Sequence, residues 1–404
     1  MRILQLAPQF PFPSDDGGKI GISNIYYQFL KQGYEVEMIC TSRFPIDNEQ
    51  INKYKKEGNI NIVLLDSRNT KLRVLKYFLM NKSMYIEKQY RSNLMQVIES
   101  LVDMSTIDII HADHSNMAKL AIQLSKKYDK PIGLRLHNIE YLIWERFYRG
   151  LSKFSPKKLF IGQQFHLLKK LELKFISDSD VAFAITKQDQ SLIKKLLPNS
   201  NIEVASAGVD VDLWRPDFNC SREPNSLVIA TNFNWFHNVN AVRWFLDRVL
   251  PKLREIYSNV QLKIIGKNPP SDFNKYISVG AKNIGYVDDV KPYFNQSKVY
   301  IAPLFVGGGI RIKILEAMAM GLPVIATDIS AEGIEANNEQ GLIRANSEEE
   351  YFNQIKILFD NEDLRIELGK KARDFILANH TWKSNVAIII NSYSKLVSSK
   401  KNKA

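Results

Sequence analysis

Cysteine is scarce in this sequence. Cys40 and Cys220 are the two cysteines among 404 residues, and neither belongs to a C-x-x-C pair. This spacing argues against a zinc site or a dithiol redox motif, and two isolated thiols are typical of a reducing compartment. Cys40 closes an apolar run, so we expect its side chain to be buried in a core.

Long apolar runs are missing as well. No stretch reaches the roughly 18 apolar residues of a membrane-spanning helix, and the run after Met1 is too short for the core of a signal peptide. A hydrophobic fraction of 45% and a charged fraction of 24% are those of a soluble globular protein, and 404 residues suggest two domains. We therefore expect a cytoplasmic protein, either free or peripheral at the inner face of the membrane.

Acidic residues are in the minority. The chain has 55 Lys and Arg against 43 Asp and Glu, which gives a formal net charge of +12. Such a charge favours anionic partners, namely nucleotides, acidic lipid surfaces or nucleic acid. Outside the tail at 398–403, which we expect to be disordered, no dense basic tract occurs and no nucleic-acid motif is present. Nucleic acid is therefore not an expected partner.

Strand-like apolar runs alternate with helical periodicity in both halves of the chain, which predicts parallel sheets with right-handed crossovers. The expected strands are 3–6, 36–40, 60–65, 107–110, 132–136 and 181–185, then 227–230, 260–266, 283–285, 299–303 and 323–327. The expected helices include 20–32, 240–253 and 385–397. We expect an N-terminal domain at 1–208, a second domain at 209–380, and a C-terminal helix with a basic tail at 381–404 that packs back on the first domain.

The most informative segment runs from 302 to 319. A predicted strand ends at Pro303, a helix is expected to start near Arg311, and between them lie three consecutive glycines, Gly307, Gly308 and Gly309. Glycine lets the backbone come close to a ligand, and a helix N-terminus offers N–H groups with partial positive charge. The segment is neither a Walker A loop nor the dinucleotide fingerprint.

Charged residues around this turn favour a ligand site. Arg311 and Lys313 suit a diphosphate, and Glu316, about one turn into the predicted helix, suits the two hydroxyls of a ribose. A glycine-rich turn capped by a solvated helix is the alternative interpretation. The three charged residues within one and a half turns favour the ligand site.

The block continues through 321–327, Gly-Leu-Pro-Val-Ile-Ala-Thr, and it resembles the donor-nucleotide motif of the GT4 family of retaining glycosyltransferases. The resemblance implies an α/β protein with the GT-B fold, in which two Rossmann-like domains face each other across a cleft. The first domain would face the acceptor, and the second would bind a nucleotide sugar. Glu316 matches the second glutamate of the motif and would hold the ribose, whereas Gly308 stands where the first glutamate is usual. The chain resembles a subgroup with Gly-Gly-Gly-x-Arg-x-Lys before the second glutamate.

Further matches extend the resemblance along the chain. Gly17 and Gly18 resemble the N-terminal glycine loop that faces the diphosphate, and a plain strand-to-helix turn is the alternative. His137, in Arg-Leu-His-Asn-Ile-Glu, corresponds to the family histidine that reaches the donor, so we expect it in the catalytic site. His111 is interpreted as structural. Asn234 is an expected donor contact.

The loop after the first strand of the second domain departs from the family. Most members place an arginine and a lysine there, but none occurs between Thr231 and Asn240. We expect Arg311 and Lys313 to supply the missing charge. With Gly308 in place of a carboxylate, we expect a front-face reaction in which the leaving phosphate helps to deprotonate the acceptor.

No cofactor and no metal are expected, because cations and helix N–H groups would stabilise the leaving diphosphate. The acidic pairs Asp15-Asp16 and Asp288-Asp289 and the string Asp178-Ser179-Asp180 are the acidic groups considered. The string has the D-x-D form of a metal motif, but it lies before an apolar strand without helper ligands, so we interpret it as a solvated loop.

The expected partners are a nucleotide-sugar donor and a glycan or lipid-linked saccharide acceptor, in polysaccharide or glycoconjugate synthesis. Two segments, 71–82 and 146–160, combine basic residues with aromatic residues and leucines, as an acidic lipid interface requires. An ordinary helix with solvated lysines is the alternative, slightly favoured for the first segment. A non-catalytic binder of nucleotide sugar or glycan and a nucleotide-sugar epimerase remain alternative functions.

Overall fold

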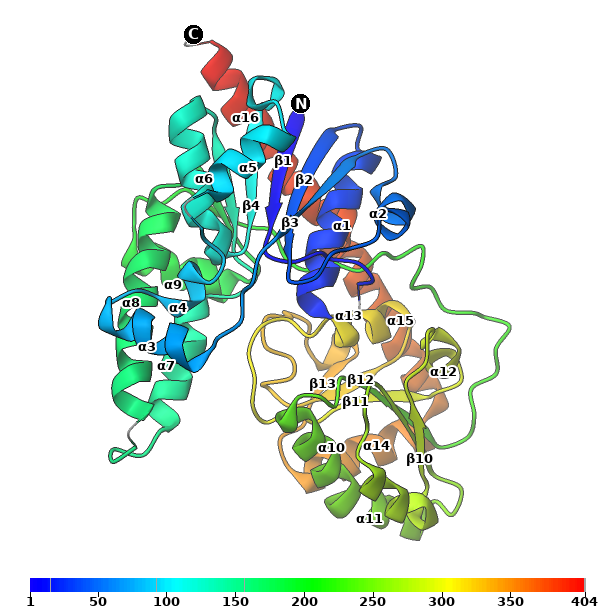
Figure 1. Cartoon of the computed structure of the whole chain (residues 1–404). Coiled ribbons are helices and arrows are strands. Elements are labelled where there is room, and N and C mark those ends of the chain that lie inside the picture. Colours follow the sequence, from blue (N-terminus) through cyan, green and yellow to red (C-terminus); the bar gives the residue numbers. More distant parts are fainter. Residues whose placement is uncertain (15, 92, 156, 403–404) are drawn as a thin grey trace. The chain divides into compact units, whose positions relative to one another are not determined.

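The computed structural model describes residues 1–14, 16–91, 93–155 and 157–402 (Figure 1). It divides into two compact units. Unit 1 consists of Met1–Ser206 together with the chain from Asn385 on, and unit 2 consists of Ala207–Ser384. The division at 206/207 lies two residues before the boundary expected at 208/209.

Unit 1 is built on a parallel sheet of seven strands in the order β3-β2-β1-β4-β5-β6-β7 within the described residues. These strands are β1 (Arg2–Ala7), β2 (Glu35–Ser42), β3 (Asn59–Leu64), β4 (Ile109–Asp113), β5 (Ile132–Arg135), β6 (Val181–Ala184) and β7 (Ile202–Val204). β1, β4, β5 and β6 are buried along nearly their whole length. Cys40 is completely buried in β2, as expected.

Helices connect these strands. They are α1 (Gly17–Lys31), α2 (Asn48–Lys55), α3 (Lys71–Leu79), α4 (Met84–Glu87), α5 (Leu94–Leu101), the 3₁₀ turn η1 (Met104–Thr106), α6 (Ser115–Tyr128), α7 (Glu140–Gly150), α8 (Lys157–Ser177) and α9 (Lys187–Leu196). α6 packs its apolar face on β4 and β5. The core of unit 1 lies between this layer and the sheet.

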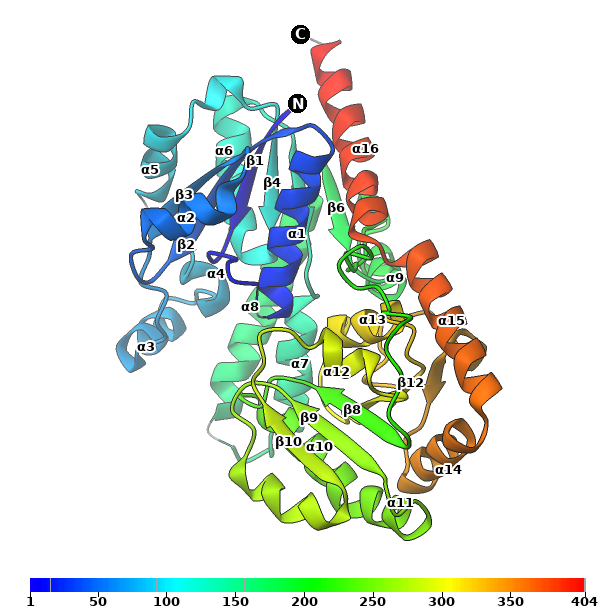
Figure 2. The same cartoon turned by 90° about the vertical axis from the view of Figure 1, so that its right-hand side faces the viewer.

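The last helix, α16 (Trp382–Lys401), packs on unit 1 (Figure 2). Its Tyr393 is completely buried, and a Cβ at Gly133 of β5 would overlap the Tyr393 ring. Glycine is therefore needed on β5 to admit this side chain. The helix continues to Lys401, so the disorder expected from Ser398 is wrong up to that residue; Lys403 lies outside the described residues.

Unit 2 has a parallel sheet of six strands in the order β10-β9-β8-β11-β12-β13 within its residues. They are β8 (Ser226–Ala230), β9 (Gln261–Ile265), β10 (Ala281–Gly285), β11 (Val299–Ala302), β12 (Val324–Ala326) and β13 (Leu342–Arg344). The other elements are α10 (Phe236–Arg248), α11 (Leu250–Ile256), η2 (Ser271–Val279), α12 (Lys291–Asn295), α13 (Ile312–Ala319), η3 (Asn338–Gln340), α14 (Glu348–Asp360) and α15 (Glu362–Asn379).

One helix expected in unit 2 is split. The prediction of a single helix at 240–253 is wrong, because α10 ends at Arg248 and α11 begins at Leu250. Pro251 lies in the first turn of α11. Proline has no N–H to donate to the preceding turn, and it is tolerated at the start of a helix rather than inside one.

Both sheets reverse their strand order at one point. In unit 1 the order turns back between β1 and β4, and in unit 2 it turns back between β8 and β11. The loops that follow these strands diverge there, and ligands of open parallel sheets bind at the carboxyl ends of strands at such a point. The candidate ligand-binding loops are therefore those after β1 and β4 in unit 1 and those after β8 and β11 in unit 2.

Candidate functional site

The glycine turn of unit 2 follows β11 and leads into α13. Gly307 and Gly309 have φ angles of 151° and 78°, which favour glycine. A Cβ at Gly307 would collide with the guanidinium of Arg311. The turn therefore needs glycine both for its backbone and for the close approach of this side chain.

Arg311 is the N-cap residue of α13, which begins at Ile312. Its Nη1 donates a hydrogen bond of 2.5 Å to the carbonyl oxygen of Gly308. Arg311 thus braces the glycine turn from inside. Gly308 contributes its carbonyl group to this contact.

Glu316 is the buried carboxylate of the turn. It is 4% exposed, and Lys313 Nζ lies 2.7 Å from its Oε2, one helical turn away on α13. Burial raises the pKa of Glu316, and the charge of Lys313 opposes this rise. Lys313 also lies over the ring of Trp214, with Nζ 5.2 Å from the ring centroid. A carboxylate held this way is suited to accept hydrogen bonds from ligand hydroxyls.

Asn234 lies in the loop after β8. Its Oδ1 accepts a hydrogen bond of 2.7 Å from Asn268, and its backbone N–H donates to Asn232 Oδ1 at 3.0 Å. In the same region, burial and then the charge of Arg311 lower the pKa of His237. The charge of Arg311 thus acts on His237 at the start of α10, the helix that follows the Asn234 loop.

The second group of candidate residues lies in unit 1, at and just after the carboxyl ends of β4 and β5. Asp113 and Arg135 are almost completely buried, and His137 is 8% exposed at its side chain. His137 Nε2 lies 2.6 Å from Arg135 Nη1 and 3.2 Å from Asp113 Oδ1. A guanidinium can only donate, so the shorter contact makes Nε2 an acceptor and leaves the hydrogen of the neutral ring on Nδ1.

The titration of this cluster follows from burial. Burial, and then the charge of Arg135, lower the pKa of His137 to about 4. Burial would raise the pKa of Asp113, but the His111 imidazole that faces this carboxylate holds its pKa well below the usual range. The cluster at neutral pH is therefore a carboxylate and a guanidinium with a neutral imidazole between them.

Gly17 and Gly18 form the first turn of α1, which starts three residues earlier than expected. Asp16 caps this helix by accepting a hydrogen bond of 2.9 Å from the Lys19 N–H. A Cβ at Gly18 would lie 3.9 Å from His114 Nε2, and a Cβ at Gly21 would lie 2.8 Å from His137 Cε1. The N-terminal turns of α1 therefore pack closely on the histidines.

His114 is a candidate residue that the sequence did not indicate. Its ring stacks on that of His137 with centroids 3.5 Å apart, and its Nε2 is buried without a hydrogen-bond partner. Its φ angle of 72° is unusual for a residue other than glycine. The one available signal was its position directly after a buried strand, at the reversal of the strand order.

His111 is completely buried, which agrees with its expected structural role. Its Nδ1 lies 2.5 Å from the hydroxyl of Tyr393, and its Nε2 lies 3.4 Å from Asp113 Oδ1. Gln5 Nε2 donates to the other carboxylate oxygen at 2.7 Å. A line of buried polar groups thus leads from α16 through Asp113 to His137.

Both aspartates of the string at 178–180 have partners within unit 1. Asp180 Oδ2 accepts a hydrogen bond of 2.7 Å from the Ile132 N–H, and Asp178 pairs with Lys174 at 2.8 Å. Asp15, of the pair Asp15-Asp16, lies outside the described residues. Among residues 1–14, 16–91, 93–155 and 157–402, no group of three His, Cys, Asp or Glu is arranged to hold a metal ion.

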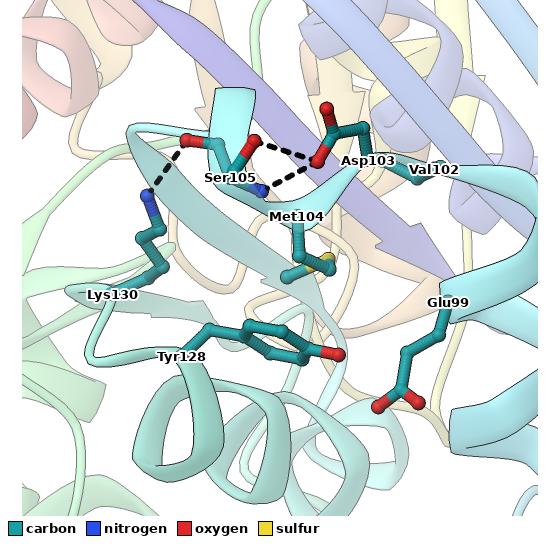
Figure 3. Close-up of a pocket in the computed structure, with 7 residues that line it drawn as sticks. All are labelled: Glu99, Val102, Asp103, Met104, Ser105, Tyr128 and Lys130. Carbon is teal, nitrogen blue, oxygen red and sulfur yellow. Dashed lines mark hydrogen bonds between the residues drawn. The ribbon is translucent and has the colours of Figure 1, made fainter.

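A shallow pocket of about 460 Å³ lies elsewhere in unit 1 (Figure 3). Its lining comes from α5, η1 and the end of α6, where Asp103 accepts hydrogen bonds from Ser105 and Lys130 donates to the Ser105 carbonyl. These elements precede β4 and β5, so the pocket lies at the amino ends of the strands. It contains none of the candidate residues, and ligands of parallel sheets bind at the opposite ends.

Comparison with known proteins agrees with these observations. Residues 224–361, which include β8 and the glycine turn, match the family model described as glycosyl transferases group 1. An uncharacterised 44.6 kDa protein in the cps region of Klebsiella pneumoniae is 22% identical over 415 residues, which cover 95% of this chain and 97% of that protein.

Solved structures resemble the whole chain. Sucrose-phosphate synthase from Thermosynechococcus elongatus aligns with a TM-score of 0.72 and 14% identity, over 99% of this chain and 100% of the other. HepE from Anabaena, solved in complex with UDP-glucose, aligns with a TM-score of 0.62 and 13% identity, over 97% and 100%. The two Rossmann-like units form the GT-B fold. Together, this fold and the matched segment support a glycosyltransferase.

Proposed function

We propose that this chain transfers a sugar from a nucleotide-sugar donor to a glycan or lipid-linked saccharide, with retention of the anomeric configuration. The reaction would serve the synthesis of cell-surface polysaccharide or glycoconjugates. The observation that carries the proposal is the buried Glu316, paired with Lys313 behind a glycine turn, within the segment that matches the group 1 family. The likeness to GT4 enzymes suggests the retaining outcome.

In this proposal unit 2 binds the donor. Glu316 accepts hydrogen bonds from the ribose hydroxyls, and the N-terminus of α13 with Lys313 stabilises the charge on the diphosphate. Arg311 keeps the glycine turn in shape and adds positive charge from behind it. Asn234 offers polar contacts from the neighbouring loop.

Unit 1 would contribute His137 and the first turn of α1. Because the pKa of His137 is about 4, the imidazole acts at neutral pH as a hydrogen-bonding group without charge. Gly17 and Gly18 present backbone N–H groups of the α1 terminus to an anion. No carboxylate stands at Gly308 to act as a nucleophile, so the proposed reaction is a front-face transfer in which the leaving phosphate takes the acceptor proton.

A donor screen tests the proposal. UDP-, GDP- and ADP-sugars are added singly, the melting temperature of the protein is measured, and nucleotide release is followed with and without acceptor extracts. UDP-glucose is the first probe, because HepE was solved with it. A donor that stabilises the protein and is consumed supports the proposal. If no acceptor carries the sugar, and the sugar is instead isomerised while still attached to its nucleotide, the protein is an epimerase.

Binding without any turnover would instead support a non-catalytic binder, which the glycine at position 308 makes a specific alternative. If none of the donors changes the melting temperature, the proposal fails.

We further propose that the reaction takes place in the cytoplasm at the inner face of the membrane, without a metal. In the described residues no helix has the length and apolar character needed to cross a membrane.

A further inference from the structure

An outward apolar stripe runs along α3 in unit 1. Leu72, Leu75 and Leu79 occupy positions i, i+3 and i+7, and Leu72 and Leu79 are 78% and 73% exposed. No residue of α3 is buried. A surface helix normally turns such a stripe toward the core, whereas this one turns it to solvent.

A second exposed apolar set lies on the start of α8 and the loop before it. Phe154 is 95% exposed and Leu159 is 73% exposed. The rings of Phe78 on α3 and Phe160 on α8 lie with centroids 6.0 Å apart, and Gln163 Nε2 donates to the Phe78 carbonyl at 3.0 Å. These contacts hold α3 against α8, side by side in both views (Figures 1 and 2).

The structure thus unites the two basic segments that lie far apart in the sequence. We call the union of residues 71–80, 146–155 and 157–160 the α3–α8 surface; Pro156 lies outside the described residues. From 71 to 82 and from 146 to 160 the sequence has no Asp or Glu. The exposed lysines that stand beside the apolar side chains are Lys71, Lys76, Lys153 and Lys157.

We infer that the α3–α8 surface docks unit 1 on an anionic lipid bilayer. Exposed leucine and phenylalanine with interspersed lysine, and no acidic residue, match the interfacial region of such a bilayer, where apolar side chains enter the acyl boundary and lysines meet the headgroups. Large apolar side chains that are exposed together on neighbouring elements are typical of interaction sites. A protein partner is the less favoured occupant, because the lysines would need matching carboxylates around each leucine.

The inference goes beyond the proposed glycosyl transfer and is tested without donor or acceptor. The full chain is mixed with vesicles of phosphatidylcholine alone or of three parts phosphatidylcholine to one part phosphatidylglycerol, and the bound fraction is measured by flotation. We expect binding to the anionic vesicles only, and weaker binding as salt is raised. Equal binding to both vesicles, or none to either, would overturn the inference.

Two sets of variants locate the contact. The triple change Leu72→Ser, Leu79→Ser, Phe154→Ser should weaken binding at least tenfold, since each removes apolar area from the bilayer. Its matched control changes exposed isoleucines of unit 2, Ile256→Ser, Ile277→Ser and Ile366→Ser. The inference fails if the control loses as much binding as the triple variant, or if the triple variant binds like the parent.

The charge set replaces Lys71, Lys76, Lys153 and Lys157 by glutamine, and its control replaces the exposed Lys126, Lys282, Lys370 and Lys383. Each lysine removed from the α3–α8 surface should weaken binding to the anionic vesicles roughly fivefold. Equal losses in both sets would mean that net charge, not this surface, attracts the bilayer. Because all the changed side chains are exposed, melting temperatures close to the parent are expected and verify folding.

Discussion

The reversal of strand order carries different chemistry in the two units. In unit 1 it holds Asp113, Arg135 and His137, which are buried and contact one another. In unit 2 it holds a glycine turn with one buried carboxylate, Glu316, and one half-exposed cation, Lys313. The members of the first group contact one another inside the fold, so they should contribute to the free energy of unfolding. The second has one internal partner, so its main contribution should be to a ligand.

The largest effect is expected for Asp113→Ala. It leaves the buried Arg135 without its carboxylate, and breaking a buried pair on one side costs about 3–5 kcal/mol. Chemical denaturation should show this loss in the free energy of unfolding. The variant Asp113→Asn keeps the shape and should lose less; if both variants unfold like the parent, the cluster does not stabilise unit 1.

Acid should weaken unit 1 through His137. Its pKa of about 4 lies below the ordinary value of 6.5, so between these values the unfolded chain binds a proton that the folded chain does not. Stability therefore falls as the pH falls from 6.5 to 4, by about 3 kcal/mol for this group. The slope of unfolding free energy against pH should shrink in His137→Gln, and an unchanged slope would contradict the assignment.

Glu316→Gln should separate binding from stability. Loss of the charge-assisted hydrogen bonds to the donor is expected to weaken donor affinity by roughly a hundredfold, since each is worth about 1.5–3 kcal/mol. The free energy of unfolding should hardly change, because the carboxylate is costly to bury. Calorimetry with UDP-glucose, or with the donor that the screen identifies, measures the first quantity. Glu332→Gln, on a loop of the same unit, is the control.

The smallest effect is expected for Tyr393→Phe. It removes the hydroxyl that contacts His111 Nδ1 but keeps the ring over Gly133, so a loss of about 1 kcal/mol is expected. Urea unfolding measures this loss. A loss as large as that of Asp113→Ala would show that the line from α16 to Asp113 acts as one unit, and the contrast between internal and ligand-directed groups would then be sharper still.

Apolar runs predicted most of the strands, because buried parallel strands are continuous apolar segments. β7 and β13 were missed because each has three residues of which one is charged, Glu203 or Arg344, whereas the equally short β12 is wholly apolar. The glycine turn and Glu316 were visible as a local string of residues. His114 was not, since its stacking on His137 depends on the adjacent ends of β4 and β5 in the sheet, which lie far apart in the sequence. The contact of Arg311 with the Gly308 carbonyl likewise depends on the turn geometry.

The return of α16 to the first unit has a consequence for synthesis on the ribosome. Tyr393 packs against Phe29 and Phe183 of unit 1. Unit 1 is synthesised first, so these rings lack the cover of α16 until almost the whole chain has emerged from the ribosome. The second unit is complete by then. A nascent chain arrested before residue 385 would hold one finished unit and one unfinished unit with exposed aromatic rings, which is the kind of surface that chaperones bind.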